Sequence, residues 1–80
     1  MEKYKGASGD TGVVAFSLGK TYIKIRFKTG PLYVYNYDTP GRMEVEEMKR
    51  LARSGKGLTT YINQFVRERY AEKMEYKRHE

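Results

Sequence analysis

The fold of this chain is decided by residues 22–37, which read Tyr22-Ile-Lys-Ile-Arg-Phe-Lys-Thr-Gly-Pro-Leu-Tyr-Val-Tyr-Asn-Tyr37. Two runs of β-branched and aromatic residues flank a turn at Thr29-Gly30-Pro31, which is typical of a β-hairpin. In the first run, apolar side chains alternate with basic ones, and in the second a tyrosine stands at every second position. Because successive side chains of a strand point to opposite faces, the first strand has one face for the core and one basic face.

The sequence on either side of the hairpin predicts an α+β fold. A short apolar run over 13–17 precedes the hairpin, so that strands over 13–17, 21–28 and 32–37 form a three-stranded antiparallel β-meander. Thr39 and Pro40 suit the start of a first helix, which ends at the glycines around Lys56. We expect this helix and a second one to pack on one face of the sheet.

The second helix is expected to start near Thr59 or Thr60. Its buried stripe is predicted from apolar residues at three- to four-residue spacing, namely Ile62, Phe65, Val66, Tyr70 and Met74. A chain of 80 residues forms one domain, which we place at 12–72. Residues 1–11 are polar and glycine-containing and are expected to be a flexible lead-in, and residues 73–80 a polar, fraying helical tail.

Composition narrows the functional classes. The chain has no cysteine, which rules out disulfides and thiolate metal sites and suits a reducing cytoplasm. No apolar run approaches the roughly 20 residues of a membrane helix. The net charge of +6 favours polyanionic partners such as RNA, DNA or anionic lipid. We therefore expect a cytoplasmic protein.

The basic residues form two clusters in the sequence. The first comprises Lys20, Lys24, Arg26 and Lys28, and the second comprises Lys49, Arg50, Arg53 and Lys56. If the two clusters meet in space, they form a basic patch that can contact phosphates, and if they lie apart, they confer ordinary solubility. The second cluster also suits the negative end of the first helix, and the glycine-rich connection that follows it favours a simple link over an anion cradle.

The length of the hairpin loop determines what the tyrosines do. A two-residue turn places Arg26 opposite Tyr33 and Lys24 opposite Tyr35. The tyrosines then share the basic face, where single-stranded bases can stack at roughly 1–3 kcal/mol each.

A three-residue loop over residues 28–30 gives the opposite result. Ile25 then faces Tyr33 and Ile23 faces Tyr35, so that the tyrosines lie under the helices as core. We prefer this second arrangement because Gly30 suits the left-handed position of a bulged hairpin loop.

The chain resembles the KTSC domain family over residues 13–70. The residues that carry the resemblance are Phe27, Gly30, Tyr33, Tyr35, Pro40, Ala52, Ser54, Gly57, Asn63, Val66, Arg67 and Tyr70, in that order. Ile62 departs from the pattern, because an aromatic residue often stands there. The family comprises small single-domain proteins of bacteria and phages and a C-terminal appendage of some lysyl-tRNA synthetases. The resemblance therefore implies RNA binding.

Catalysis has little support in the sequence. The single histidine, His79, lies in the polar tail, so the serines lack a convincing base. Glu44, Glu46 and Glu47 lie on one helix turn without histidine or aspartate partners, which favours a solvated face over a metal site. We expect a protein that is not an enzyme and has no cofactor and no metal.

The preferred hypothesis is a small module that binds RNA or another single-stranded nucleic acid. The expected contacts are Lys24, Arg26, Lys28, Lys49, Arg50, Arg53, Lys56 and Arg67, with Tyr33 and Tyr35 either stacking bases or supporting the sheet. The alternative is a protein-interaction or adaptor module that uses a sheet edge or the aliphatic residues Leu32 and Val34. No membrane partner is expected, and a monomer is favoured over an oligomer.

Overall fold

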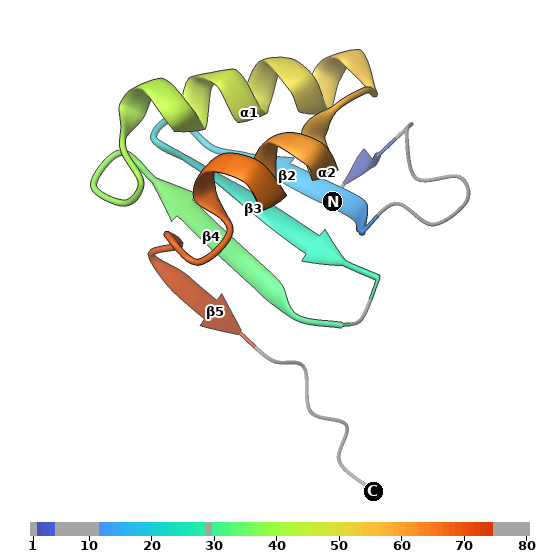
Figure 1. Cartoon of the computed structure of the whole chain (residues 1–80), viewed down its shortest axis with the longest axis horizontal. Helices are drawn as coiled ribbons and strands as arrows, with labels where there is room; N and C mark the ends of the chain where they lie inside the picture. Colours follow the sequence, from blue (N-terminus) through green and yellow to red (C-terminus); the bar gives the residue numbers. More distant parts are fainter. Residues whose placement is uncertain (1, 5–11, 29, 75–80) are drawn as a thin grey trace, which may run out of the picture.

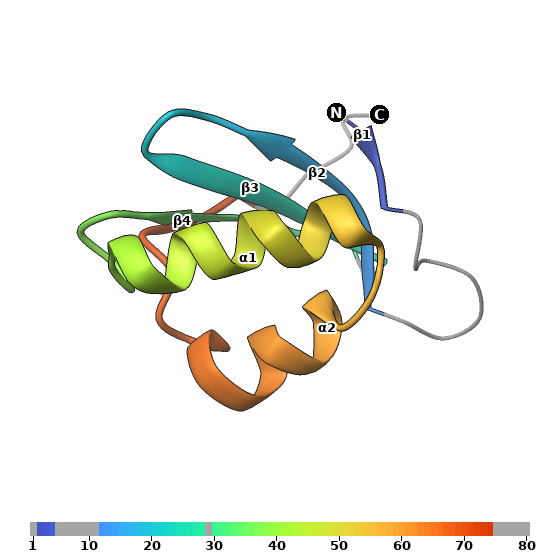
Figure 2. The ribbon, with the colours of Figure 1, turned by 90° about the horizontal axis from the view of Figure 1, so that it is seen from above.

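The predicted hairpin forms strands β3 (Tyr22–Phe27) and β4 (Leu32–Asn36). The computed structural model describes residues 2–4, 12–28 and 30–74. Strand β2 (Val13–Leu18) pairs with β3, so the three predicted strands are confirmed. In the described residues, the chain adopts an α+β fold in which the helices cover one face of an antiparallel sheet (Figures 1 and 2).

The hairpin has the register of the three-residue loop. Ile25 pairs with Tyr33 and Ile23 with Tyr35. The N–H of Phe27 donates to the carbonyl of Pro31 (3.1 Å), so residues 28–30 form the connection. Gly30 has φ of +118°, in the region that favours glycine. The preferred arrangement is therefore confirmed, and the tyrosines face the helices.

The sheet has five strands instead of the expected three. Strands β1 (Glu2–Lys3) and β5 (Glu72–Met74) pair with β2 and β4, and the strand order is β1-β2-β3-β4-β5 (Figure 1). The outer strands of a three-stranded meander would leave a row of unpaired backbone groups, which these two short strands partly satisfy. Strand β1 has two residues and β5 has three, which is too short for an alternating pattern to be recognised in the sequence.

Residues at the amino end contribute to the core, although 1–11 were expected to be a flexible lead-in. Tyr4 is buried, its N–H donates to the carbonyl of Val14 (3.0 Å), and its hydroxyl accepts the N–H of Leu58 (3.1 Å). The expectation is thus wrong for residues 2–4, and for residues 1 and 5–11 it falls outside the described part of the chain.

The first helix begins later than expected. Helix α1 (Arg42–Ser54) starts after Gly41 and not at Pro40. The expected cap at Thr39 is wrong, because the side-chain oxygen of Asn36 accepts the N–H of Thr39 (2.8 Å) and holds it in a turn. At the other end, Gly55 adopts the left-handed conformation, and its N–H donates to the carbonyl of Leu51 (3.0 Å), as a glycine C-cap does.

The second helix is shorter than predicted and changes its winding. An α-helical turn, α2 (Leu58–Tyr61), continues as a π-helical segment, η1 (Ile62–Val66). The chain then leaves the helix layer and joins the sheet, where the N–H of Ala71 donates to the carbonyl of Val34 (2.7 Å). Met74 therefore lies in β5 and not on a helical stripe, and the expected helical tail is wrong for residues 73 and 74. Residues 75–80 lie outside the described part.

The core lies between the sheet and the helix layer. Its sheet side includes Ile23, Ile25 and Tyr35, and its helix side comprises Val45, Met48, Ala52, Leu58, Ile62 and Val66. Phe65 was expected in this core but is 58% exposed, because the wider π-helical winding shifts the residues that face the sheet. The opposite face of the sheet carries no helix (Figure 2). Across the described residues, no helix has the length and apolar character needed to cross a membrane.

The buried hydroxyl of Tyr35 yields the first prediction. It has no hydrogen-bond partner among the described residues, although Tyr35 is 0% exposed. A buried polar group without a partner costs roughly 1–3 kcal/mol. Tyr35→Phe is therefore expected to raise the free energy of unfolding by about 1 kcal/mol, measured by urea denaturation.

Tyr37→Phe is the matched control. The hydroxyl of Tyr37 donates to Glu46 (2.6 Å), so the same chemical change is expected to lower stability there. A destabilised Tyr35→Phe variant would contradict the prediction, because it would mean that the hydroxyl has a bound partner such as an internal water.

Candidate nucleic-acid interface

The two basic clusters do not meet in space. Lys24 and Arg26 pair with Val34 and Leu32 on the side of the sheet that carries no helix. The second cluster lies on and just after α1, which covers the opposite side (Figure 2). Lys28 is exposed in the hairpin loop. The condition for a single continuous basic patch is therefore not met.

Lys49 is a structural residue and not a surface cation. It is 5% exposed, its Nζ donates to the carbonyl of Lys20 (3.0 Å), and it pairs with Glu46 (3.1 Å). The ring of Tyr37 lies 5.8 Å from the same nitrogen. The expected nucleic-acid contact at Lys49 is wrong, because its charge is used to join α1 to the β2–β3 turn.

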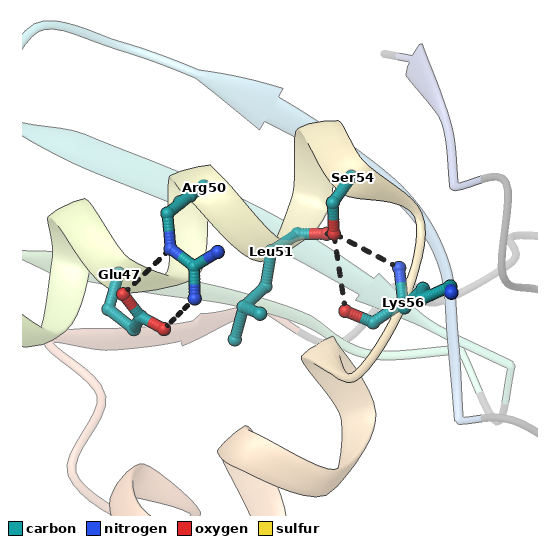
Figure 3. Close-up of polar contacts among 5 residues, drawn as sticks. All are labelled: Glu47, Arg50, Leu51, Ser54 and Lys56. Atoms are coloured by element: carbon teal, nitrogen blue, oxygen red, sulfur yellow. Dashed lines mark hydrogen bonds and ion pairs between the residues drawn. The ribbon is translucent and has the colours of Figure 1, made fainter.

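Arg50 is exposed but paired with an acid. Its Nε and Nη2 contact the two carboxylate oxygens of Glu47 at 3.1 and 2.5 Å (Figure 3). This contact lowers the pKa of Glu47 and raises the pKa of Arg50. Arg53 and Lys56 are exposed, and among the described residues neither side chain has an ion-pair partner. The cluster thus retains two of its four charges for outside partners.

The connection after α1 is closed by its own hydrogen bonds. The hydroxyl of Ser54 donates to the carbonyl of Leu51 (3.0 Å) and accepts the N–H of Lys56 (3.3 Å) (Figure 3). Thr59, near the expected start of the second helix, does not cap it, and its hydroxyl accepts the N–H of Val13 (3.3 Å). These contacts agree with the interpretation of the glycine-rich segment as a simple link.

The helix-free side of the sheet, called here the outer face, combines cations with an aromatic ring. Its residues include Tyr22, Lys24, Arg26, Leu32, Val34, Asn36, Glu72 and Met74. The Nζ of Lys24 lies 5.7 Å from the ring of Tyr22. An open pocket of about 320 Å³ lies between them and β5, lined by Thr21, Tyr22, Lys24, Val34, Asn36, Glu72 and Met74.

Tyr22 was not among the expected stacking residues, which were Tyr33 and Tyr35. Its position depends on Gly19, since a Cβ added to that glycine would lie 2.1 Å from the ring of Tyr22. The alternation of the strand places Tyr22 on the same side as Lys24 and Arg26, so the signal was present in the sequence.

Tyr35 cannot stack a base, because it is 0% exposed and lies under the helices. Its burial raises the pKa of its hydroxyl well above the usual value, and the neighbouring hydroxyls of Tyr33 and Tyr70 add to this effect. The expected nucleic-acid contact at Tyr35 is therefore wrong, and its role is to fill the core.

Tyr33 and Arg67 are brought together at the seam between the sheet and η1. They line a second pocket, of about 180 Å³, together with Phe27, Ile62 and Asn63; we call it the tyrosine pocket. Tyr33 is half-buried there, and its ring centroid lies 4.9 Å from that of Phe27 and 4.7 Å from that of Tyr70. Arg67 is exposed at the rim. Phe27 and Asn63 were not among the expected nucleic-acid contacts.

The part of the chain that the structure describes contains no group of three or more histidine, cysteine or acidic side chains that could hold a metal ion. Comparisons with protein-family models, with curated proteins and with solved structures each gave no match. The resemblance to the KTSC family stays a prediction. Four of the residues that carry it, Phe27, Tyr33, Asn63 and Arg67, line the tyrosine pocket.

Glu46 yields a prediction about pH. Hydrogen bonds from Tyr37 and Lys49 lower its pKa below the usual value of 4.5. A carboxylate with a lowered folded-state pKa contributes stability above its unfolded-state pKa and loses that contribution as the pH falls through the folded-state pKa. Glu46→Gln is therefore expected to be less stable than the wild type near neutral pH, with a difference that shrinks from about pH 5 to pH 3.

The measurement is urea denaturation of both proteins across this pH range. A difference that stays constant with pH would contradict the prediction, because the amide keeps the shape of the side chain and removes only the titrating charge.

The packing of Tyr22 on Gly19 yields a further prediction. In Gly19→Ala, the new methyl group is expected to displace the half-buried ring of Tyr22 from its rotamer, at a cost of roughly 0.5–1.5 kcal/mol in stability. Aromatic NMR signals should change for Tyr22 and not for the core residue Tyr35. Unchanged signals for Tyr22 would show that its ring does not lie on Gly19 in solution.

Proposed function

We propose that this chain is a small, non-catalytic, KTSC-like module of the cytoplasm that binds RNA or another single-stranded nucleic acid on its outer face. The observation that carries the proposal is the position of Tyr22, Lys24 and Arg26 on one sheet face that no helix covers. The proposed contacts are Tyr22, Lys24 and Arg26. They differ from the expected set, because Tyr22 is added and the expected residues that lie away from the outer face are left out.

The chemistry of the outer face suits a single strand. The ring of Tyr22 offers a stacking surface, and base stacking on an aromatic side chain contributes roughly 1–3 kcal/mol. Lys24 and Arg26 supply charges for phosphates, whose contacts give affinity without reading the sequence of bases. A duplex keeps its bases paired and stacked, so only a single strand can use the ring as well as the charges.

A protein partner is the second candidate, and it rests on a specific observation. Leu32 and Met74 lie on the same outer face, where Leu32 is partly exposed and Met74, on the edge strand β5, is 41% exposed. Exposed apolar side chains at a sheet edge are typical of surfaces that bind another protein. A protein-binding outer face would show association that persists at high salt, whereas phosphate contacts weaken with salt.

Neutralising the outer face tests the proposal. Lys24→Gln/Arg26→Gln is expected to weaken binding to single-stranded RNA and to reduce the salt slope of log K by about 1.4, since each phosphate contact on a single strand contributes about 0.7. The measurement is fluorescence anisotropy with single-stranded RNA, single-stranded DNA and duplex at about 50 and 200 mM salt.

The matched control is Arg50→Gln/Arg53→Gln, which removes the same number of positive charges from α1 on the opposite side. The control should retain most of the affinity and nearly the full salt slope. Equal loss in both variants would mean that net charge alone attracts the strand. Weak, equal binding to all three nucleic acids would remove the proposal and favour a protein partner.

A further inference from the structure

The tyrosine pocket lies apart from the outer face. The side chain of Tyr33 is on the inner side of β4, whereas Val34 and Lys24 face outwards. Contacts on the outer face therefore leave the tyrosine pocket without a role. Its walls come from three elements, since Phe27 belongs to β3, Tyr33 to β4 and Asn63 to η1.

The wall formed by the sheet is aromatic. The ring centroids of Phe27 and Tyr33 lie 4.9 Å apart with an interplanar angle of 57°, and the ring of Tyr70 also contacts Tyr33. Phe27 and Tyr33 are each partly exposed and line the pocket. A planar ligand ring can therefore pack against them.

The helical wall supplies polar groups. The π-helical segment η1 carries Asn63, and Arg67 follows directly after it, so both side chains reach the same pocket. Among the described residues, neither side chain has a hydrogen-bond or ion-pair partner. Isolated π-helical turns often occur at functional sites, where they change the direction of side chains.

These groups point to a ligand that joins a planar ring to an anion. A guanidinium binds phosphate or carboxylate in a two-pronged geometry, and an asparagine amide offers a donor beside an acceptor, as the edge of a nucleobase does. The pocket volume of about 180 Å³ is below the roughly 300–1,000 Å³ of pockets for drug-sized ligands. It therefore suits one ring system and not two stacked bases.

We propose that the tyrosine pocket binds a single nucleotide, with its base on the rings of Phe27 and Tyr33, its phosphate on Arg67 and its base edge on Asn63. The inference rests on the proposed function for the class of ligand. It adds a second site that holds one unpaired nucleotide, and this site is separate from the strand-binding outer face.

NMR titration of the ¹⁵N-labelled full chain tests this site. The probes are uridine 5′-monophosphate, adenosine 5′-monophosphate, the corresponding nucleosides and inorganic phosphate. The nucleotides are expected to shift the side-chain signals of Asn63 and Arg67 with saturation and a Kd on the order of 1 mM or below. Nucleosides should bind about tenfold more weakly because they lack the phosphate, and phosphate alone should bind weaker still.

Substitutions of Arg67 and Asn63 distinguish binding in the tyrosine pocket from nonspecific electrostatic attraction. Arg67→Gln is expected to weaken nucleotide binding about tenfold and to leave nucleoside binding unchanged, whereas Asn63→Ala should weaken both. Both residues are exposed, so the substitutions leave the core intact. Arg53→Gln, which removes an exposed charge elsewhere, is the matched control and should change neither.

The result that overturns the inference is the absence of saturable shifts at Asn63 and Arg67 with any nucleotide. Equal binding of inorganic phosphate and nucleotides would also overturn it, because the rings would then contribute nothing.

Different results would contradict the nucleotide site in the tyrosine pocket and the proposed strand-binding function of the outer face. An RNA strand that binds with shifts confined to Tyr22, Lys24 and Arg26 removes the tyrosine pocket and retains the strand-binding function. The opposite result is that nucleotides saturate the tyrosine pocket, also in Lys24→Gln/Arg26→Gln, and that no strand binds the outer face. This result removes the strand-binding function and retains the pocket.

Discussion

The register of the β3–β4 hairpin is the constraint on which the rest of the structure depends. The loop over residues 28–30 and the positive φ of Gly30 place Ile25 opposite Tyr33 and Ile23 opposite Tyr35. A shift by one residue would turn every side chain of β4 to the other face. The register therefore decides at once that the tyrosines support the core and that the cations of β3 face solvent.

Tyr33 and Tyr35 of β4 and Tyr37, which directly follows the strand, show how position changes the chemistry of one residue type. Tyr37, at one end, donates to Glu46 in a network that also holds Lys49. Tyr35, in the middle, is fully buried, and Tyr33, at the other end, borders a pocket. Tyr37 thus contacts charged groups, Tyr35 lies in the apolar core, and Tyr33 borders a pocket that a ligand can reach.

The positive charge of the protein is distributed over both layers. Lys49 is used inside the structure and Arg50 is paired with Glu47, so the second cluster offers fewer charges than its sequence suggests. Lys24 and Arg26 lie instead on a helix-free face beside Tyr22. The net charge thus overstates how basic the surface of α1 is. The register of the hairpin turns Tyr33 and Tyr35 to the inner face, so the aromatic ring beside the cations of β3 is Tyr22.

The apolar run over 13–17, the alternation of residues in 22–37 and the helical spacing before Ala52 were sufficient to predict the three central strands, the first helix and the basic face of β3. These are local patterns, in which each residue's environment follows from its near neighbours. Only the tertiary structure decided the edge strands β1 and β5, the burial of Lys49 and the meeting of Asn63 with Tyr33. Each of these requires segments far apart in the chain to pair or pack, and spacing within one segment does not specify such contacts.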